Sequence, residues 1–153
     1  MRIGPAEWPR DTEIVRALFR EYADSLGFDL GFQDFERELR ELPGDYEAPC
    51  GCVLIARAGG SAAGCMGLRR LEAGTAELKR LYVRPEFRGR GLGRSLTEAA
   101  MEQARAAGYA RVRLDTVPSM TEAIELYRTL GFRPIPPYRY NPVPGTRFLE
   151  LTL

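Results

Sequence analysis

The fold of this chain is decided by residues 81–95, Leu81-Tyr82-Val83-Arg84-Pro85-Glu86-Phe87-Arg88-Gly89-Arg90-Gly91-Leu92-Gly93-Arg94-Ser95. The apolar residues before Pro85 are typical of a strand, and those after Gly91 have helical spacing. Three alternate glycines join the two parts, because glycine lets a backbone turn sharply and approach a ligand closely. The stretch therefore predicts a strand that runs through a glycine-rich loop into a helix.

This loop predicts a site for a pyrophosphate. The first amides of a helix have no partner within it and carry the positive end of its dipole, so they bind phosphate oxygens. Arg88, Arg90 and Arg94 add positive charge to the same loop. The predicted phosphate-binding residues are Arg88, Gly89, Arg90, Gly91, Leu92, Gly93, Arg94 and Ser95.

Other phosphate-binding loops do not fit the spacing. A nucleoside-triphosphate loop ends in Gly-Lys-Ser/Thr, whereas Gly93 is followed by Arg94 and Ser95. A dinucleotide-binding loop has a glycine where Arg94 stands, and it usually opens the first strand, helix, strand unit of a chain. The interleaved glycines also favour a compact phosphate ligand over a nucleic acid, so no nucleic-acid partner is expected.

The elements around the loop predict an α/β fold with a mixed, mostly antiparallel central sheet flanked by helices. Three meandering strands are expected over residues 52–57, 63–70 and 75–83, followed by a helix over 91–107 and a strand over 111–117. A helix over 121–130 and a strand over 147–153 complete the C-terminal part, after a proline-rich loop. Two helices precede the sheet, one over 12–26 and one through Phe32, Phe35, Leu39 and Leu42, with a loop over 44–51. A length of 153 residues suits one domain, 1–153.

Composition excludes several kinds of site. The chain has no histidine and three cysteines, which removes histidine triads and dyads as well as four-cysteine zinc sites, so no metal is expected. The odd set of Cys50, Cys52 and Cys65 favours a reducing compartment over a disulfide framework. With no long apolar run and no apolar leader, a cytoplasmic protein without a membrane partner is expected.

Charge is unevenly distributed along the chain. Residues 20–50 contain nine acidic residues and three basic ones, whereas residues 79–113 contain nine basic residues and three acidic ones. An acidic first part would suit a cationic substrate, and solvated helix faces explain the same charges nearly as well.

The loop Arg88-Gly89-Arg90-Gly91-Leu92-Gly93 matches Arg/Gln-x-x-Gly-x-Gly/Ala, and here the chain resembles the GNAT superfamily of acetyltransferases. The resemblance extends to Glu77-Leu78-Lys79-Arg80-Leu81-Tyr82-Val83 before the loop and to Ala123-Ile124-Glu125-Leu126-Tyr127-Arg128-Thr129-Leu130-Gly131-Phe132 after it. It covers roughly residues 52–133, and the order of strands and helices agrees as well.

The resemblance implies an N-acetyltransferase that moves an acetyl group from acetyl-coenzyme A to a primary amine of a small molecule, peptide or protein. The strand of Leu81, Tyr82 and Val83 would pair with the pantetheine arm, and the loop would hold the pyrophosphate. Tyr127 would protonate the departing thiolate, and Glu77 would deprotonate the amine directly or through water. One departure is Met120, which stands where many relatives have an asparagine that contacts the cofactor, so this contact is either missing or supplied by Ser119.

Each of these residues also has a structural interpretation. Tyr127 has the helical spacing of a core aromatic residue. Glu77 could be a solvated strand charge or half of a surface pair with Lys79 or Arg80. An alternative function is a non-catalytic acyl-coenzyme A sensor or interaction module. Many relatives are dimers, so a homodimer is also open.

Overall fold

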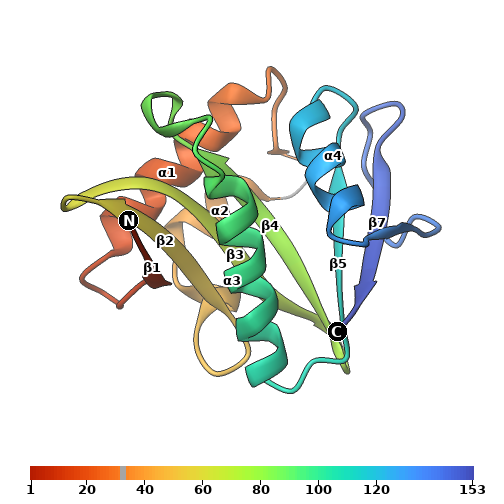
Figure 1. Cartoon of the computed structure of the whole chain (residues 1–153), viewed down its shortest axis with the longest axis horizontal. Coiled ribbons are helices and arrows are strands. Elements are labelled where there is room, and N and C mark those ends of the chain that lie inside the picture. Colours follow the sequence, from red (N-terminus) through yellow and green to blue (C-terminus); the bar gives the residue numbers. More distant parts are fainter. Residues whose placement is uncertain (32–33) are drawn as a thin grey trace.

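The computed structural model describes residues 1–31 and 34–153. Its helices are α1 (Thr12–Ser25), α2 (Phe35–Arg40), α3 (Leu92–Ala106) and α4 (Thr121–Thr129), with short 3-10 helices η2 (Gly44–Tyr46) and η3 (Pro85–Phe87). Its strands are β1 (Arg2–Pro5), β2 (Cys52–Ala58), β3 (Ser61–Glu72), β4 (Thr75–Val83), β5 (Arg111–Thr116), β6 (Arg133–Pro134) and β7 (Arg147–Thr152). Figure 1 shows their arrangement along the chain.

One seven-stranded sheet has the order β1-β2-β3-β4-β5-β7-β6. All neighbouring pairs are antiparallel except β4 and β5, which are parallel. The predicted mixed, mostly antiparallel sheet with flanking helices is confirmed. Helix α3 connects the two parallel strands, as the crossover rule for such pairs requires.

The parallel pair is short. Thr75, Ala76 and Glu77 of β4 pair with residues 111–113 of β5, and the pairing stops there. Strand β4 continues to Val83, and beyond Glu77 it bonds only to β3 among the described strands. The sheet is therefore open between β4 and β5 along the second half of both strands (Figure 1).

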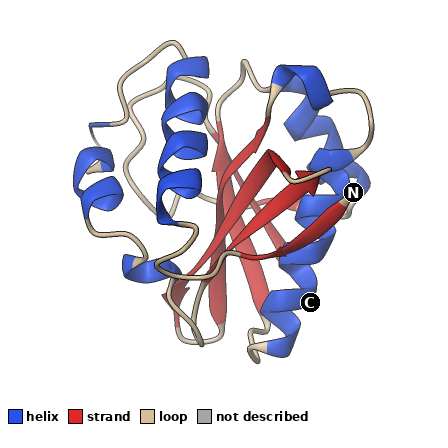
Figure 2. Ribbon diagram, turned by 90° about the vertical axis from the view of Figure 1, so that its left-hand side faces the viewer, coloured by secondary structure: helices blue, strands red, loops and turns tan. Residues whose placement is uncertain are grey.

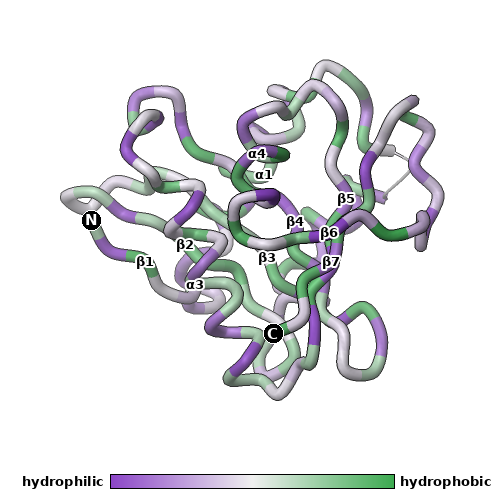
Figure 3. The backbone as a smooth tube through the Cα atoms, turned by 45° about the vertical axis from the view of Figure 1, so that its right-hand side comes forward, coloured by the Kyte–Doolittle hydropathy of each residue, from purple (hydrophilic) through white to green (hydrophobic). Residues whose placement is uncertain are grey.

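The two faces of the sheet bury separate hydrophobic cores (Figure 2). Helices α3 and α4 cover one face, with Leu96, Ala100 and Ala104 of α3 fully buried. Helices α1 and α2 cover the other face, with Val15, Leu18, Phe19 and Leu39 buried. Apolar residues follow the central strands, and polar residues gather in the outer turns (Figure 3).

Strand β4 contains a bulge at Arg80. Cys65 lies opposite Tyr82 and Gly67 opposite Lys79, so β4 has one residue more than β3 over this interval. Arg80 adopts a φ of 62°, which a side chain other than glycine seldom adopts. The bulge lies beside the gap between β4 and β5.

The predicted elements are present, with changes at their ends. The second helix begins at Phe35, and Phe32 lies outside the described residues. A 3-10 turn occupies residues 44–46, where a loop was expected. Strands β1 and β6 were not predicted, because Arg2–Pro5 and Arg133–Pro134 are too short to show an alternating pattern.

Candidate active site

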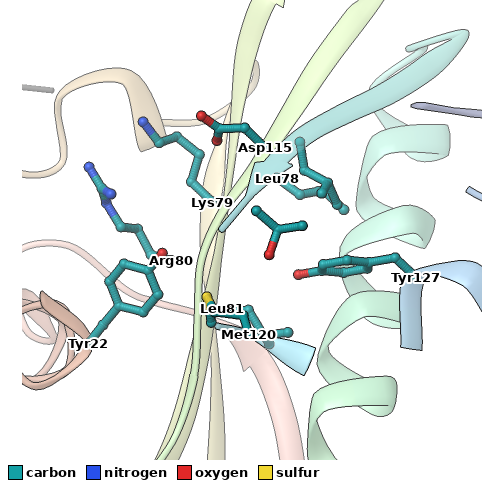
Figure 4. Close-up of a pocket in the computed structure, with 10 residues that line it drawn as sticks. Tyr22, Leu78, Lys79, Arg80, Leu81, Asp115, Met120 and Tyr127 are labelled. Carbon is teal, nitrogen blue, oxygen red and sulfur yellow. The ribbon is translucent and has the colours of Figure 1, made fainter. Parts of the chain in front are cut away.

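A narrow cavity lies in the gap between the diverging strands, and we call it the β4–β5 cavity. Its volume is about 30 Å³. It is lined by Tyr22, Leu78, Lys79, Arg80, Leu81, Leu114, Asp115, Thr116, Met120 and Tyr127. Figure 4 shows Tyr127 pointing toward β4 from one side, whereas Tyr22, Lys79 and Arg80 lie on the other side of this strand.

Tyr127 directs its hydroxyl from α4 toward β4 in this cavity (Figure 4). The side chain is buried, and its ring packs against Phe132 at a centroid distance of 5.4 Å. Burial, with smaller contributions from Tyr22 and Asp115, raises the pKa of Tyr127. The hydroxyl therefore keeps its proton at neutral pH and is available as a donor.

The glycine-rich loop joins η3 to α3, as predicted. Gly89 and Gly91 have φ values of 79° and 74°, a region that favours glycine, and Gly91 is the residue before the helix. No side chain caps α3, so its first amides remain available to a ligand. Arg88, Gly89, Arg90, Gly91, Arg94 and Ser95 are exposed, Gly93 is partly exposed and Leu92 is buried.

The arginines of the loop have partners of their own. Arg88 donates from Nε to the carbonyl of Val83 at 2.9 Å and lies over the ring of Tyr82. Arg94 lies 3.4 Å from the carboxylate of Glu98. These contacts hold the Arg88 side chain beside the end of β4 and the Arg94 side chain along the first turns of α3.

The three strand residues of the predicted site lie along the open edge of β4. Leu81 and Val83 are partly buried and pack against the core under α3, whereas Tyr82 is buried on the opposite face. Leu81 also lines the β4–β5 cavity. Because β5 has diverged, the β4 main chain here faces the gap.

Glu77 is fully buried at 0% exposure, so it is not a solvated strand charge. Its carboxylate accepts hydrogen bonds from Arg69 Nε at 3.1 Å, Arg139 Nη2 at 2.7 Å and Tyr138 Oη at 2.7 Å. Burial alone would raise the pKa of Glu77, but the charges of Lys79, Arg139 and Arg69 and the Tyr138 hydrogen bond lower it. Glu77 is not among the residues that line the β4–β5 cavity.

A scan against family models matches residues 13–132 to the acetyltransferase (GNAT) family. The chain belongs to the GNAT acetyltransferase family. An uncharacterized N-acetyltransferase of Schizosaccharomyces pombe is 35% identical over 99% of this chain and 94% of its own length. The GNAT family consists of acyltransferases, so the chain is an enzyme of this class.

Solved structures have the same fold. A GNAT-family acetyltransferase of Staphylococcus aureus has a TM-score of 0.81 at 19% identity, covering 99% of this chain and 98% of its own. A Salmonella typhimurium protein, solved with its cofactor acetyl-CoA, has a TM-score of 0.69 at 21% identity, covering 99% of this chain and 93% of its own.

Three polar residues of this GNAT site were not predicted. Asp115 lines the β4–β5 cavity and accepts a hydrogen bond from Asn141 Nδ2 at 3.2 Å. Lys79 and Arg80 also line it, and both are buried. The alternation of Arg111, Arg113 and Asp115 along β5 was the available signal for Asp115, since it places the three on one face.

At the GNAT asparagine position, Met120 precedes α4 and lines the β4–β5 cavity. Ser119 is exposed and does not line it. An apolar side chain, Met120, therefore lines the cavity at the position where an asparagine is missing, and Ser119 does not line the cavity in its place.

Two other findings concern sites and membranes. Within residues 1–31 and 34–153, no group of three or more Cys, Asp or Glu side chains gathers in a way that could hold a metal ion. None of the helices in the described part of the chain is long and apolar enough to cross a membrane.

Proposed function

We propose that this protein transfers the acetyl group of acetyl-CoA to a primary amine by direct attack in a ternary complex. The observation that carries the proposal is the β4–β5 cavity, where the Tyr127 hydroxyl faces the open edge of β4. The uncapped start of α3 follows the same strand through the glycine loop. A phosphate site and a proton donor therefore flank one gap in the sheet.

The residues present fit acetyl-CoA. The amides at the start of α3, with Arg88, Arg90 and Arg94, would bind the pyrophosphate. The main chain of Leu81 and Val83 would pair with the pantetheine arm as an added strand would, because that edge of β4 has no strand partner among the described residues. A Salmonella typhimurium protein of the same fold was solved with its cofactor acetyl-CoA, which supports acetyl-CoA as the acyl donor.

When bound, acetyl-CoA supplies a thioester carbonyl for attack by an amine. We propose that a main-chain amide near Leu81 polarises the carbonyl oxygen. As the C–N bond forms and the C–S bond breaks, Tyr127 donates its proton to the sulfur. The raised pKa of Tyr127 suits a donor that must be protonated at neutral pH.

The amine must also lose a proton. Glu77 is too enclosed to contact an amine in the cavity, so we propose that it receives the proton through water. Its lowered pKa keeps it ionised at neutral pH and therefore able to accept. Asp115 lines the cavity, and we propose that it holds the amine end of the acceptor.

The experiment is a coenzyme A release assay with acetyl-CoA and a panel of amines, namely spermidine, an aminoglycoside, amino acids and basic peptides. Amine-dependent release of coenzyme A with formation of the N-acetyl product is expected. Binding of acetyl-CoA without release for every amine would favour the alternative, a non-catalytic acyl-CoA sensor. We place the activity in the cytoplasm, since the three cysteines are free thiols, as a reducing compartment maintains them.

A further inference from the structure

Asp115 is the single acidic side chain among the described residues that line the β4–β5 cavity. It is partly buried near the end of β5. Leu114 before it packs in the core under α3, so the alternation of the strand directs Asp115 to the opposite face of the sheet. The charge of Asp115 contributes, after burial and Tyr22, to the raised pKa of Tyr127. A carboxylate therefore lies near the hydroxyl of the proposed proton donor.

The charge of Asp115 is not neutralised by an ion pair. Within residues 1–31 and 34–153, no lysine or arginine lies within ion-pair distance of its carboxylate. On the same strand, Arg113 pairs instead with Glu150 at 2.7 Å and with Glu72 at 3.1 Å. The buried carboxylate of Glu77, by contrast, accepts hydrogen bonds from two arginines. Asp115 is thus the carboxylate of the site that keeps its charge for a ligand.

The partner of Asp115 is a neutral amide. Asn141, in the loop before β7 (residues 135–146), donates from Nδ2 to Asp115 Oδ2 at 3.2 Å. The amide oxygen of Asn141 accepts from the main-chain N–H of Val143 at 3.0 Å, so its NH2 group faces the carboxylate. No hydrogen bond within the described residues reaches the second oxygen of Asp115, Oδ1. An amide orients a carboxylate in this way without neutralising it, whereas an arginine would do both.

The loop before β7 is also anchored on β4. Tyr138 Oη and Arg139 Nη2 each donate to the buried carboxylate of Glu77 at 2.7 Å. Glu77 is the last residue of β4 that pairs with β5, so residues 138–141 contact both strands where the strands separate. This anchor fixes the position of the Asn141 amide relative to β5.

We infer that Asn141 is a positioning residue for the acceptor: it orients the Asp115 carboxylate so that Oδ1 receives an N–H of the amine. This inference rests on the proposed transfer to an amine and names a residue that sets the affinity of that site for the acceptor. Asn141 does not itself line the β4–β5 cavity, so it acts through Asp115. Its loss should therefore change KM for the amine rather than kcat.

The test is a double-mutant cycle of Asn141→Ser and Asp115→Asn, measured as KM and kcat for the amine of the panel with the highest kcat/KM. A serine hydroxyl can form the same turn with Val143 but is too short to reach Asp115. Each single substitution is expected to raise KM about tenfold, the scale of one lost hydrogen bond to a charged group. The double variant is expected to match Asp115→Asn within about twofold, because Asn141 then has no charge to orient.

Thr146→Val is the matched control. Thr146 Oγ1 donates to the carbonyl of Val143 in the same loop at 2.7 Å, and this bond does not involve Asp115. The control should keep the KM of the wild type, and urea denaturation checks that each variant is folded, with Asn141→Ala as a second variant at the same position. An unchanged KM in the Asn141 variants would overturn the inference while leaving amine acetylation intact. Effects on KM that multiply in the double variant would also overturn it, since Asn141 would then act independently of Asp115.

Direct binding separates this inference from the proposed function. If no amine is acetylated, the proposed transfer fails, and calorimetric titration of spermidine into the coenzyme A complex tests Asn141 by itself. Binding weakened about tenfold by Asn141→Ser and by Asp115→Asn, and no further in the double variant, would support an amine site that Asn141 positions. Absence of spermidine binding, or binding that both substitutions leave unchanged, would overturn the inference.

Discussion

At the scale of single residues, we propose that the Tyr127 hydroxyl is the proton donor, and a substitution by phenylalanine tests this role. Tyr127→Phe keeps the packing of the ring against Phe132 and removes only the proton donor. We expect kcat to fall by about 10² or more, the usual contribution of a positioned acid, with little change in acetyl-CoA affinity. Steady-state kinetics and calorimetric titration of acetyl-CoA measure the two quantities. Equal losses in binding and rate would mean that Tyr127 is a packing residue.

Glu77 and Asp115 have different environments and should respond differently to pH. Glu77→Gln should lower kcat at neutral pH, and higher pH should restore much of it because the amine then loses its proton to solvent. Asp115→Asn should mainly raise KM for the amine. Rate profiles over pH 6 to 10 compare the variants. The reverse pattern, with pH-dependent recovery in Asp115→Asn, would transfer the base role to Asp115.

Lys79 makes stability depend on pH. Burial is the largest cause that lowers the pKa of Lys79, followed by the charge of Arg80, and Arg69 on β3 and Arg139 in the loop before β7 lower it as well. The attraction of Glu77 on β4 opposes these effects, and the sum brings the pKa from 10.5 to about 7. Between these two pH values the unfolded chain binds more protons at this residue than the folded protein. The free energy of unfolding therefore gains a contribution that rises with pH over that range.

Lys79→Met removes this contribution. The unfolding free energy of the wild type, minus that of the variant, should increase from about pH 7 to about pH 10. Urea denaturation at several pH values measures the difference. A difference that stays flat or falls would mean that Lys79 keeps an ordinary pKa in the folded protein.

At the scale of elements, α2 is anchored to β4 through one ion pair. Arg80 has a side chain that is 2% exposed, with Glu38 as its bidentate partner and the ring of Phe35 at 5.1 Å. Glu38→Ala leaves a buried guanidinium without this partner, and we expect a loss of about 3–5 kcal/mol in unfolding free energy.

Glu36 on the same helix provides the control. It pairs with Arg20, and both side chains are more than half exposed. Glu36→Ala should therefore cost only about 0–1 kcal/mol. Chemical denaturation of both variants gives the comparison, and similar losses would mean that the buried pair contributes no more than a surface pair.

Local patterns explain why most elements could be predicted. The helical spacing of Leu92, Leu96 and Ala100 matches the face of α3 that is buried. By contrast, β1 is stabilised by pairing Ile3 and Gly4 with β2, more than fifty residues away along the chain. Short edge strands of this kind depend on a partner that no local window contains.

At the scale of the whole molecule, the two cores share one sheet. Leu54 packs on the face under α3, and its neighbours Val53 and Ile55 pack on the face under α1. We therefore propose that residues 1–153 form one folding unit and expect one cooperative unfolding transition. Circular dichroism and Trp8 fluorescence should give coincident unfolding curves. Acetyl-CoA at about 100 times its Kd should add about 2.7 kcal/mol to the free energy of unfolding. Separate transitions would indicate two independently folding parts.

Counting charges along the sequence does not predict which charged side chains meet in the folded protein. The position of residues 88–95 at the start of α3 and of Tyr127 on α4 could be predicted because both lie within contiguous motifs. The setting of Lys79 could not, since its neighbours Arg69 and Arg139 come from β3 and from the loop before β7. The acidic stretch 20–50 pointed to a cationic acceptor, whereas Glu38 and Glu21 of that stretch pair with Arg80 and Arg84, which lie far away along the chain. The homodimer stays a prediction that light scattering can measure.

The divergence of β4 from β5 also bears on solubility. An unpaired strand edge at the rim of a sheet can template pairing with another chain and so promote aggregation. Here the unpaired stretch lies inside the sheet, with β5 and β7 beyond it and Tyr127 of α4 across the gap. A flexible, slender ligand can enter that space, whereas a strand of another folded molecule meets side chains first. The protein can thus leave main-chain groups open for a ligand without offering them to its own copies.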